Sequence, residues 1–458
     1  MPVLHDNMLT HLKKLSTLQS NKGVHFLTPA AIPGSHCPMN AAASTLQSNK
    51  GVHFLTPAAI PGSHCPMNAA ARLAGSVQGL SSLIIGTQEC AYYSRLVLRD
   101  SYGKAGELHW MYVLDANEVV FGCREGLSQA LAEMDQAGVK AILLIVTCLP
   151  DLIGEDMEAI IHELQPKLAA RLIFISAPHF ACNGHPSGIW RTLEAMAGIM
   201  QQCTIIPHSV NLLGLHAASA SEIPLLTSLS AAGVKLRGLG PDSTLDEFLS
   251  APDAAINIVL SPYMAPLAKR MDNDFSTPFV YLHDKYGIRD IDIAYARIGE
   301  RLGLDFGNAF TEGRNALKKA EERVAKKLNE LSFFATDITL DPIPLSAYLS
   351  TQGMKPLLLH IEEFYQEDRQ WAQVLYTQGH DPLVCHRVNN LAEVSVFKML
   401  KPAFNLGPVP PSLKQKIPHV DQLHKMNGTF GYERTTWLLD KIMQALSTPA
   451  SDLLKEMI

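Results

Sequence analysis

Three cysteines in the first third of the chain have the residue type and spacing to hold a metal. Cys65 lies in HCPMNAAA, Cys90 in GTQECAYYSR and Cys148 in VTCLPDLIGED, each where a strand or turn passes into a predicted helix. The separations of 25 (90 − 65) and 58 (148 − 90) residues are too long for a zinc knuckle or a CxxC redox pair. Thiolates at the ends of different strands could instead hold one face of a shared metal cluster.

The same three cysteines have a plainer interpretation, in which they belong to the hydrophobic core. A cysteine that binds no metal packs as a small apolar residue. Taken without their neighbours, the three cysteines favour this interpretation. Zinc fits them less well than an iron–sulfur cluster, because the chain has no CxxC or HxxxH and a fourth zinc ligand is missing.

The overall composition predicts a soluble globular protein of several domains. At about 150 residues per domain, 458 residues predict three domains, and a hydrophobic content of 47% is enough to form their cores. A net charge of −6 argues against nucleic-acid binding. No apolar run is long enough to cross a membrane, and eight thinly spread cysteines suit a reducing compartment. We therefore predict a cytoplasmic protein that binds neither nucleic acid nor membrane.

An internal duplication precedes the predicted fold. Residues 16–43 are repeated letter for letter at residues 44–71. Natural repeats diverge, and a solenoid needs at least three copies. We interpret the repeat as a recent duplication or an artefact of sequence assembly, so that Cys37 is a copy and Cys65 is the relevant cysteine.

From residue 80 onward, apolar strands alternate with amphipathic helices, a pattern typical of parallel sheets. The predicted strands are 81–87, 141–146, 172–176, 204–213, 233–236, 256–260, 279–282, 356–361 and 382–388. The predicted helices include 118–134, 153–164, 223–232, 244–249, 313–333, 368–377 and the apolar-faced segment 428–446.

These elements predict an α/β fold of three Rossmann-like, doubly wound domains with mainly parallel sheets. In such domains, binding sites form at the carboxyl ends of the strands, where all three cysteines are expected. The expected domains are an N-terminal region at 1–71, a first α/β domain at 72–195 completed by 415–458, a second at 196–335 and a third at 336–414.

The segments around the cysteines resemble the nitrogenase component 1 superfamily. Cys65, the GTQEC turn at Cys90, the Phe121-Gly122 pair and TCxxxxIGED at Cys148 follow the order of the three cluster cysteines in that family's subunits. Segments 250–271 and TFGYE at 429–433 resemble the second domain and the start of the C-terminal helix of β-type subunits. The resemblance implies that Cys65, Cys90 and Cys148 bind an iron–sulfur cluster.

The resemblance also indicates the type of subunit. In α-type catalytic subunits, a cysteine that holds the active-site cofactor follows the strand that 256–260 resembles, whereas this chain has Ser261. This implies a β-type subunit that shares a relay cluster with an α-like chain in an α2β2 heterotetramer. Three thiolates per chain suit an [8Fe-7S] P-type cluster better than a [4Fe-4S] cluster. The active-site metallocluster would be held mainly by the partner, and no catalytic residue is assigned to this chain, which we expect to be inactive alone.

A further partner is implied because no phosphate-binding loop is visible. The sequence contains neither GxxxxGK[ST] nor GxGxxG. ATP hydrolysis would therefore come from a homodimeric iron–sulfur reductase, which in this family supplies electrons one at a time.

Several residues depart from the family pattern. His179 lies between Pro178 and Phe180, where nitrogenase-type β-subunits carry a serine that can bind the oxidised cluster. Its imidazole could bind iron, but we favour a role as a hydrogen-bond donor beside the cluster. The remaining residues of interest are Cys123 close to the cluster, His424 near the position of the cofactor histidine, and Cys182, His185 and Cys385 as core or rim residues.

Three functions remain open on the sequence alone. The first is an electron-relay subunit of a nitrogenase-like reductase, for which reductive C–S cleavage of methylthio-alkanes is our leading substrate chemistry. The second is a scaffold that assembles a nitrogenase-type cofactor. The third is a subunit of a dark-operative tetrapyrrole reductase, whose relay would be a four-iron cluster.

Overall fold

The computed structural model describes most of the chain after residue 65. The described residues are 10–13, 65–98, 106–178, 185–214, 223–336, 341–361, 364–386, 393–414, 416–426 and 429–447. The first copy of the duplicated segment and most of the second lie outside these ranges. The chain divides into two compact units: the cysteine unit, residues 30–220 with 233–279, and the C-terminal unit, residues 1–29, 221–232 and 280–458.

Three largely parallel sheets confirm the predicted fold class. Two sheets of four strands and one of six strands are present in the described residues. No described helix is long and apolar enough to cross a membrane. The predicted domain bounds inside the two units stay predictions.

The first sheet, in the cysteine unit, has the strand order β3-β2-β4-β5 with all strands parallel. Strands β2 and β4 are buried along their whole length, as central strands covered on both faces must be. The four strands are β2 (Leu80–Gly86), β3 (His109–Val113), β4 (Ala141–Val146) and β5 (Arg171–Ser176). The sequence pattern predicted β4 with these bounds but missed β3, an edge strand whose residues are only partly buried.

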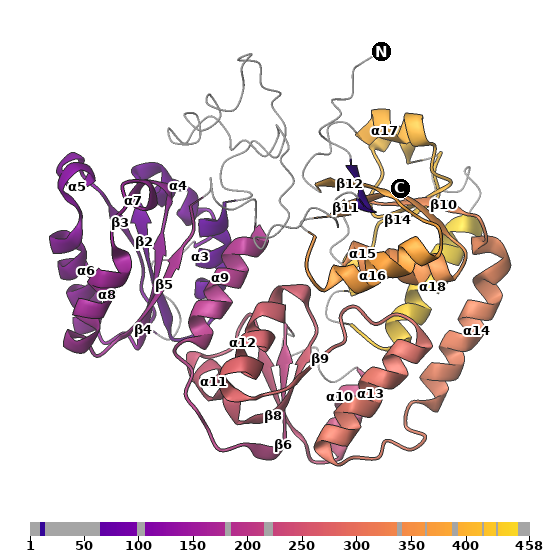
Figure 1. The fold of residues 1–458 in the computed structure, drawn as a ribbon, viewed down its shortest axis with the longest axis horizontal. Helices are drawn as coiled ribbons and strands as arrows, with labels where there is room; N and C mark the ends of the chain where they lie inside the picture. The colour runs from indigo at the N-terminus through magenta and orange to yellow at the C-terminus, as the bar shows by residue number, and fades with distance from the viewer. Residues whose placement is uncertain are drawn as a thin grey trace, which may run out of the picture. The chain divides into compact units, whose positions relative to one another are not determined.

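Helices cover both faces of the first sheet (Figure 1). On one face lie α6 (Arg124–Gln136) and α8 (Met157–Leu164), whose apolar stripes pack on the sheet in one core cluster. On the other face lie α3 (Pro66–Ser76) and α9 (His185–Ala197). Three shorter helices follow strands β2, β3 and β4 and lie at one end of the sheet: α4 (Gln88–Arg95), α5 (Ala116–Phe121) and α7 (Cys148–Leu152).

The second sheet has the order β7-β6-β8-β9, and the division between the two units falls within β9. The strands are β6 (Ile206–Leu213), β7 (Lys235–Leu239), β8 (Ala254–Val259) and β9 (Phe279–Tyr281). The cysteine unit adds α11 (Leu245–Ser250) and α12 (Ala265–Phe275), whereas α10 (Pro224–Ala231) groups with the C-terminal unit.

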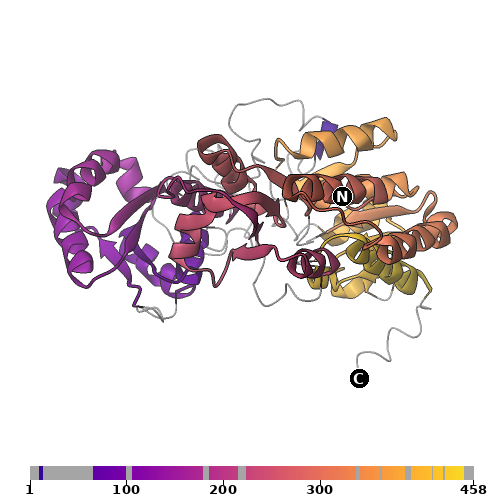
Figure 2. The same ribbon diagram turned by 90° about the horizontal axis from the view of Figure 1, so that it is seen from below.

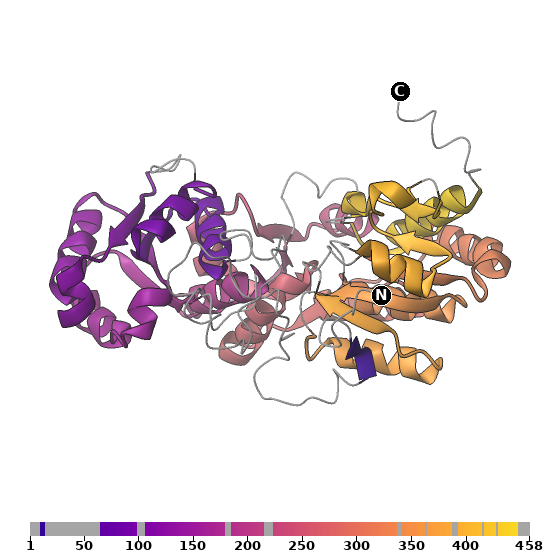
Figure 3. The ribbon, with the colours of Figure 1, turned by 90° about the horizontal axis from the view of Figure 1, so that it is seen from above.

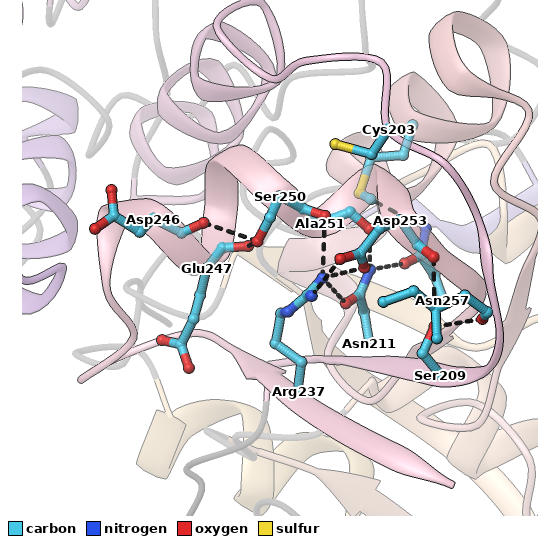
Figure 4. Close-up of polar contacts among 12 residues, drawn as sticks. Cys203, Ser209, Asn211, Arg237, Asp246, Glu247, Ser250, Ala251, Asp253 and Asn257 are labelled. Atoms are coloured by element: carbon cyan, nitrogen blue, oxygen red, sulfur yellow. Dashed lines mark hydrogen bonds and ion pairs between the residues drawn. The ribbon is translucent and has the colours of Figure 1, made fainter.

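A buried polar row crosses the second sheet (Figure 4). Asn211 on β6 is the register partner of Arg237 on β7 and of Asn257 on β8. Its amide nitrogen donates to Asn257 at 2.8 Å, and its oxygen accepts from Arg237 at 3.1 Å. Arg237 also donates to Asp253 at 2.8 Å, and the arginine side chain is only 9% exposed. These partners satisfy one another, so the row ties three strands together.

The third sheet, in the C-terminal unit, has the order β1-β12-β11-β10-β13-β14, in which only β1 is antiparallel. Helices flank it on both sides (Figure 2), and α17 packs on β10 and β11 through Val396 and Phe397. Its strands are β1 (Thr10–His11), β10 (Ser332–Ala335), β11 (Lys355–Ile361), β12 (Leu383–His386), β13 (Phe404–Leu406) and β14 (His419–Val420). The helices are α13 (Ile288–Leu302), α14 (Thr311–Leu328), α15 (Pro342–Thr351), α16 (Asp368–Thr377), α17 (Glu393–Leu400) and α18 (Tyr432–Ser447).

Two expectations differ from the observed C-terminal unit. The helix predicted at 313–333 ends at Leu328, because Glu330 has a φ of 64° and the chain then enters the buried strand β10. Residues 415–458 were expected to complete the first α/β domain. In their described part, β14 joins the third sheet beside β13 and α18 contacts α14, so these residues group with the C-terminal unit.

Candidate functional site

The three predicted cysteines all lie at helix starts in the cysteine unit, as the sequence pattern predicted. Cys65 is the N-cap of α3, Cys90 is the third residue of α4, and Cys148 is the first residue of α7. Each is a thiol; Cys65 and Cys90 are partly exposed, whereas Cys148 is buried. Helix starts carry unpaired amide groups and a partial positive charge, which favour thiolate over thiol.

Cys65 is held in place by the packing of α3. Its carbonyl accepts from the amide of Asn68 at 2.9 Å, which closes the first turn. Helix α9 passes close to this turn, because a Cβ on Gly188 would lie 2.2 Å from the carbonyl oxygen of Pro66. Only a glycine at position 188 allows that approach. Helix α3 also contacts α4 and β2, so the helix that begins after Cys65 lies beside the helix that carries Cys90.

Cys148 is held by hydrogen bonds between two neighbouring strands. The residue before it, Thr147, donates to the carbonyl of Ile85 from its amide at 3.0 Å and from its hydroxyl at 2.8 Å. Ile85 lies on β2, two residues before Thr87, the N-cap of α4, and five residues before Cys90. Strands β2 and β4 are adjacent and parallel, so their carboxyl ends present Cys90 and Cys148 at the same edge.

The edge carries an unusual amount of exposed apolar surface. Phe121 at the end of α5 is 84% exposed and Val120 is 71% exposed. Among the described residues, seven of the eleven exposed large hydrophobic side chains follow β2, β3 or β4 (Figure 3 looks down on this end of the sheet): Tyr92, Leu96, Val113, Val120, Phe121, Leu152 and Ile153. Exposed apolar side chains gathered near the same strand ends are candidates for contact with another chain.

The donor set fits an iron–sulfur cluster better than a single metal ion. Within the described part of the chain, no three histidine, cysteine, aspartate or glutamate side chains converge on one ion. Thiols spaced along an edge can each bind a different iron of a larger cluster, and thiolate is the ligand that such clusters use. Binding of a cluster by these three thiols stays a prediction.

Cys123 is a core residue and not a member of the edge. Its side chain is 1% exposed and belongs to the core cluster beneath α6. Burial, together with the carboxylates of Glu155 and Glu118, raises the pKa of the Cys123 thiol to about 12. Glu155 also accepts from the Cys123 amide at 3.1 Å. These surroundings do not favour metal binding by the Cys123 thiol, and the expectation that Cys123 lies close to a cluster stays a prediction.

The other predicted residues lie outside the site or outside the described residues. His179 and Cys182 are not among the described residues, nor are the side chains of His185, Cys385 and His424. Ser261 is described and lies two residues after the end of β8, with Leu260 between them. It packs against Gly214, where a Cβ would lie 2.7 Å from the Cβ of Ser261. A hydroxyl, not a thiol, therefore lies near the end of β8.

Two residues of the site escaped the sequence analysis. Thr147 bridges the strand ends, and Thr87 donates from its hydroxyl to the sulfur of Cys90 at 3.6 Å. A signal for both was present, because each is a threonine directly before a predicted helix and so resembles an N-cap. What could not be read from the sequence is that neither hydroxyl caps its helix.

Comparison with known proteins identifies the family of this chain. The sequence model of one family, described as nitrogenase component 1 type oxidoreductase, matches residues 65–447. The chain is 29% identical over 324 residues to the nitrogenase iron-molybdenum cofactor biosynthesis protein NifE of Clostridium pasteurianum, covering 65% of this chain and 68% of that protein. It is 24% identical over 242 residues to a nitrogenase molybdenum-iron protein alpha chain of Methanococcus maripaludis, covering 51% of this chain and 49% of that protein.

A solved structure shows the same fold. The structure titled nitrogenase Cp1 at pH 6.5 superposes with a TM-score of 0.66 and 15% identity, covering 87% of this chain and 94% of that chain. At this identity the likeness concerns the fold alone. The sequence matches to the two relatives above span about half to two thirds of their lengths.

Proposed function

Because this chain belongs to the nitrogenase component 1 type oxidoreductase family, we propose that it is a cluster-holding subunit of a nitrogenase-like complex. We further propose that it serves in assembling a metallocluster and does not itself reduce substrate. The observation that carries the first part is the row of three thiols at helix starts along one sheet edge. The second part rests on Ser261 and on the likeness to NifE.

The cysteine edge would be completed by a second chain. Cys65, Cys90 and Cys148 would supply three thiolates, and an equivalent set from an α-like partner would supply the rest. The exposed apolar helices around the thiols support this arrangement, since a partner that covers them also excludes water from a cluster. Six thiolates suit an [8Fe-7S] cluster better than a [4Fe-4S] cluster. Electrons would reach such a cluster from an ATP-hydrolysing iron–sulfur reductase.

The serine at the end of β8 favours assembly over turnover. A hydroxyl is a much poorer iron ligand than a thiolate, so Ser261 would not hold an active-site cofactor firmly. A subunit that binds a cofactor loosely can pass it on. The likeness to NifE, a protein named for cofactor biosynthesis, agrees with that role.

The chain would be purified anaerobically together with its partners to test cluster binding. We expect about as much sulfide as iron, and loss of most iron in Cys90→Ala and Cys148→Ala. Cys203→Ala is the matched control, because this thiol lies in the same unit but only donates to the carbonyl of Gln201 at 3.3 Å. A complex that contains only zinc, or equal iron in all variants, would contradict cluster binding by these thiols.

A transfer assay tests the assembly role. We expect the loaded complex to restore activity to a cofactor-deficient nitrogenase, and we expect no ATP-dependent substrate reduction by the complex itself. The second candidate function, an electron-relay subunit of a nitrogenase-like reductase, is favoured by the complete set of three thiols. It predicts the reverse outcome, with reductase-dependent turnover, for example C–S cleavage of methylthio-alkanes. Four irons per heterodimer would instead favour a tetrapyrrole-reductase type of relay.

A further inference from the structure

Thr87 occupies an N-cap position but does not cap its helix. Its backbone is extended, with φ −89° and ψ 169°, as N-cap residues are, and helix α4 begins at the next residue. An N-cap threonine ordinarily accepts a hydrogen bond from the amide of the second or third helical residue. Here no such bond forms. Instead, the Thr87 hydroxyl donates to Sγ of Cys90 at 3.6 Å.

A second threonine in the same unit shows what the ordinary arrangement looks like. Thr244 is the N-cap of α11, and its hydroxyl oxygen accepts from the amide of Glu247 at 3.2 Å. Glu247 is the third residue of α11, the position that Cys90 holds in α4. In both helices a threonine is the N-cap, and the third helical residue is Cys90 in α4 and Glu247 in α11. The Thr244 hydroxyl also donates to the Glu247 carboxylate at 3.0 Å, so donating and capping are compatible, whereas the Thr87 hydroxyl donates to sulfur and does not cap.

The direction of this bond has a chemical consequence. A hydroxyl proton aimed at sulfur stabilises negative charge on that sulfur, because hydrogen bonds to ionised acceptors are the stronger ones. A one-electron reduction adds one negative charge to an iron–sulfur cluster, and part of that charge resides on its ligand sulfurs. Donors to these sulfurs therefore raise the reduction potential.

We propose that Thr87 is a positioning residue that orients Cys90 and, by donating to its sulfur, raises the reduction potential of the bound cluster. This inference rests on the proposed function, because it needs a cluster bound through Cys90. The electron comes from the iron–sulfur reductase of that proposal. Glu89, an acidic residue in the first turn of α4, is left unchanged in every variant below, so its own effect on the potential cancels.

The experiment compares three variants of the full complex. Thr87→Val keeps the shape of the side chain and removes the hydroxyl, Thr87→Ser keeps the hydroxyl, and Thr244→Val removes a genuine cap. The midpoint potential of the cluster is measured by redox titration followed by EPR. We expect a more negative midpoint in Thr87→Val, and wild-type midpoints in Thr87→Ser and Thr244→Val.

Hydrogen exchange of the metal-free chain supplies the second measurement. We expect Thr87→Val to leave the exchange of the first-turn amides of α4 unchanged, because the hydroxyl does not bind them. Thr244→Val should accelerate exchange at the start of α11. Faster exchange in α4 combined with an unchanged midpoint in Thr87→Val would show an ordinary cap and overturn the inference. An absence of iron in the wild-type complex would overturn the proposed function and this inference together, whereas bound iron with equal midpoints overturns the inference alone.

Discussion

A Cβ placed on Gly86 would lie 2.1 Å from the hydroxyl oxygen of Thr147, a distance that real Cβ atoms essentially never show. Gly86 ends β2 shortly before Cys90, and Thr147 directly precedes Cys148. The contact therefore sets how closely the two cysteine-bearing strand ends approach each other. Thr147 cannot swing away easily, because both its amide and its hydroxyl bind the carbonyl of Ile85.

Gly86→Ala should disturb both stability and cluster binding. The new methyl group must displace Thr147, and overpacking of this kind costs about 1–3 kcal/mol. We expect a lower unfolding free energy in denaturant titration and less iron in the purified complex. Adding Thr147→Ala should recover part of both losses. Gly287→Ala is the matched control, because Gly287 has a φ of −75° and its added Cβ would meet no atom closer than 3.5 Å. Equal behaviour of Gly86→Ala and Gly287→Ala would contradict this account.

Cys123→Ala should keep the iron that Cys148→Ala loses. The Cys123 thiol is buried in the core, and its pKa of about 12 leaves almost no thiolate at neutral pH. Its removal should cost only about 1 kcal/mol of unfolding free energy, the cost of a small cavity. Iron analysis and denaturant titration of the two variants check both points. Substantial iron loss in Cys123→Ala would show that the thiol does bind the cluster.

Arg237→Met should strongly destabilise the cysteine unit. The Arg237 side chain is 9% exposed and donates to the amide oxygen of Asn211 and the carboxylate of Asp253. Its removal leaves both largely buried acceptors without this donor. Loss of one partner of a buried ion pair costs about 3–5 kcal/mol. Lys140→Met is the control, since the Lys140–Asp246 pair is 63% and 69% exposed and should contribute less than about 1 kcal/mol. Similar unfolding free energies of the two variants would refute the structural role of the row.

Asp368→Asn should flatten the pH dependence of the C-terminal unit's stability. Burial, followed by the nearby carboxylates of Asp341, Glu367 and Asp284, raises the pKa of Asp368 well above its ordinary value. The folded chain therefore holds this proton more tightly than the unfolded chain does. As the pH rises above the unfolded pKa of about 3.9, this group lowers stability by up to about 1.4 kcal/mol per pH unit until the folded pKa is passed.

The asparagine variant cannot lose that proton, and its amide oxygen can still accept from the backbone amide of Tyr365, which lies 2.9 Å from Asp368 in the native chain. We expect Asp368→Asn to exceed the wild type in unfolding free energy at pH 8 and to approach it near pH 4. Asp421→Asn, at an exposed position, should leave the dependence of the unfolding free energy on pH unchanged. If the unfolding free energies of the wild type and of Asp368→Asn change with pH in parallel, the loss of the Asp368 proton does not affect stability.

Much of the fold follows from local sequence patterns. The strand at 141–146 and the helix at 368–377 were predicted with the bounds observed, because a short apolar run and a helical apolar stripe are local signals. The same patterns predicted that Cys65, Cys90 and Cys148 stand at helix starts. The half-buried edge strand β3 was missed, since partly exposed strands carry a weaker pattern. The boundary at Glu330 was missed because a left-handed residue other than glycine leaves no clear sequence signal.

The α/β class, the order of most elements and the position of each cysteine before or within a helix follow from local sequence patterns. The neighbours that those cysteines contact depend on how the strands and helices pack. Thr87 and Thr147 look alike in sequence, yet one hydroxyl donates to a sulfur and the other to a carbonyl on the adjacent strand. Cys123 precedes α6 and is buried in the core cluster that this helix covers, whereas Cys148 begins α7 at the carboxyl end of β4. The physical reason is that hydrogen-bond direction and burial depend on residues far apart in sequence, which only the packing of parallel strands brings together.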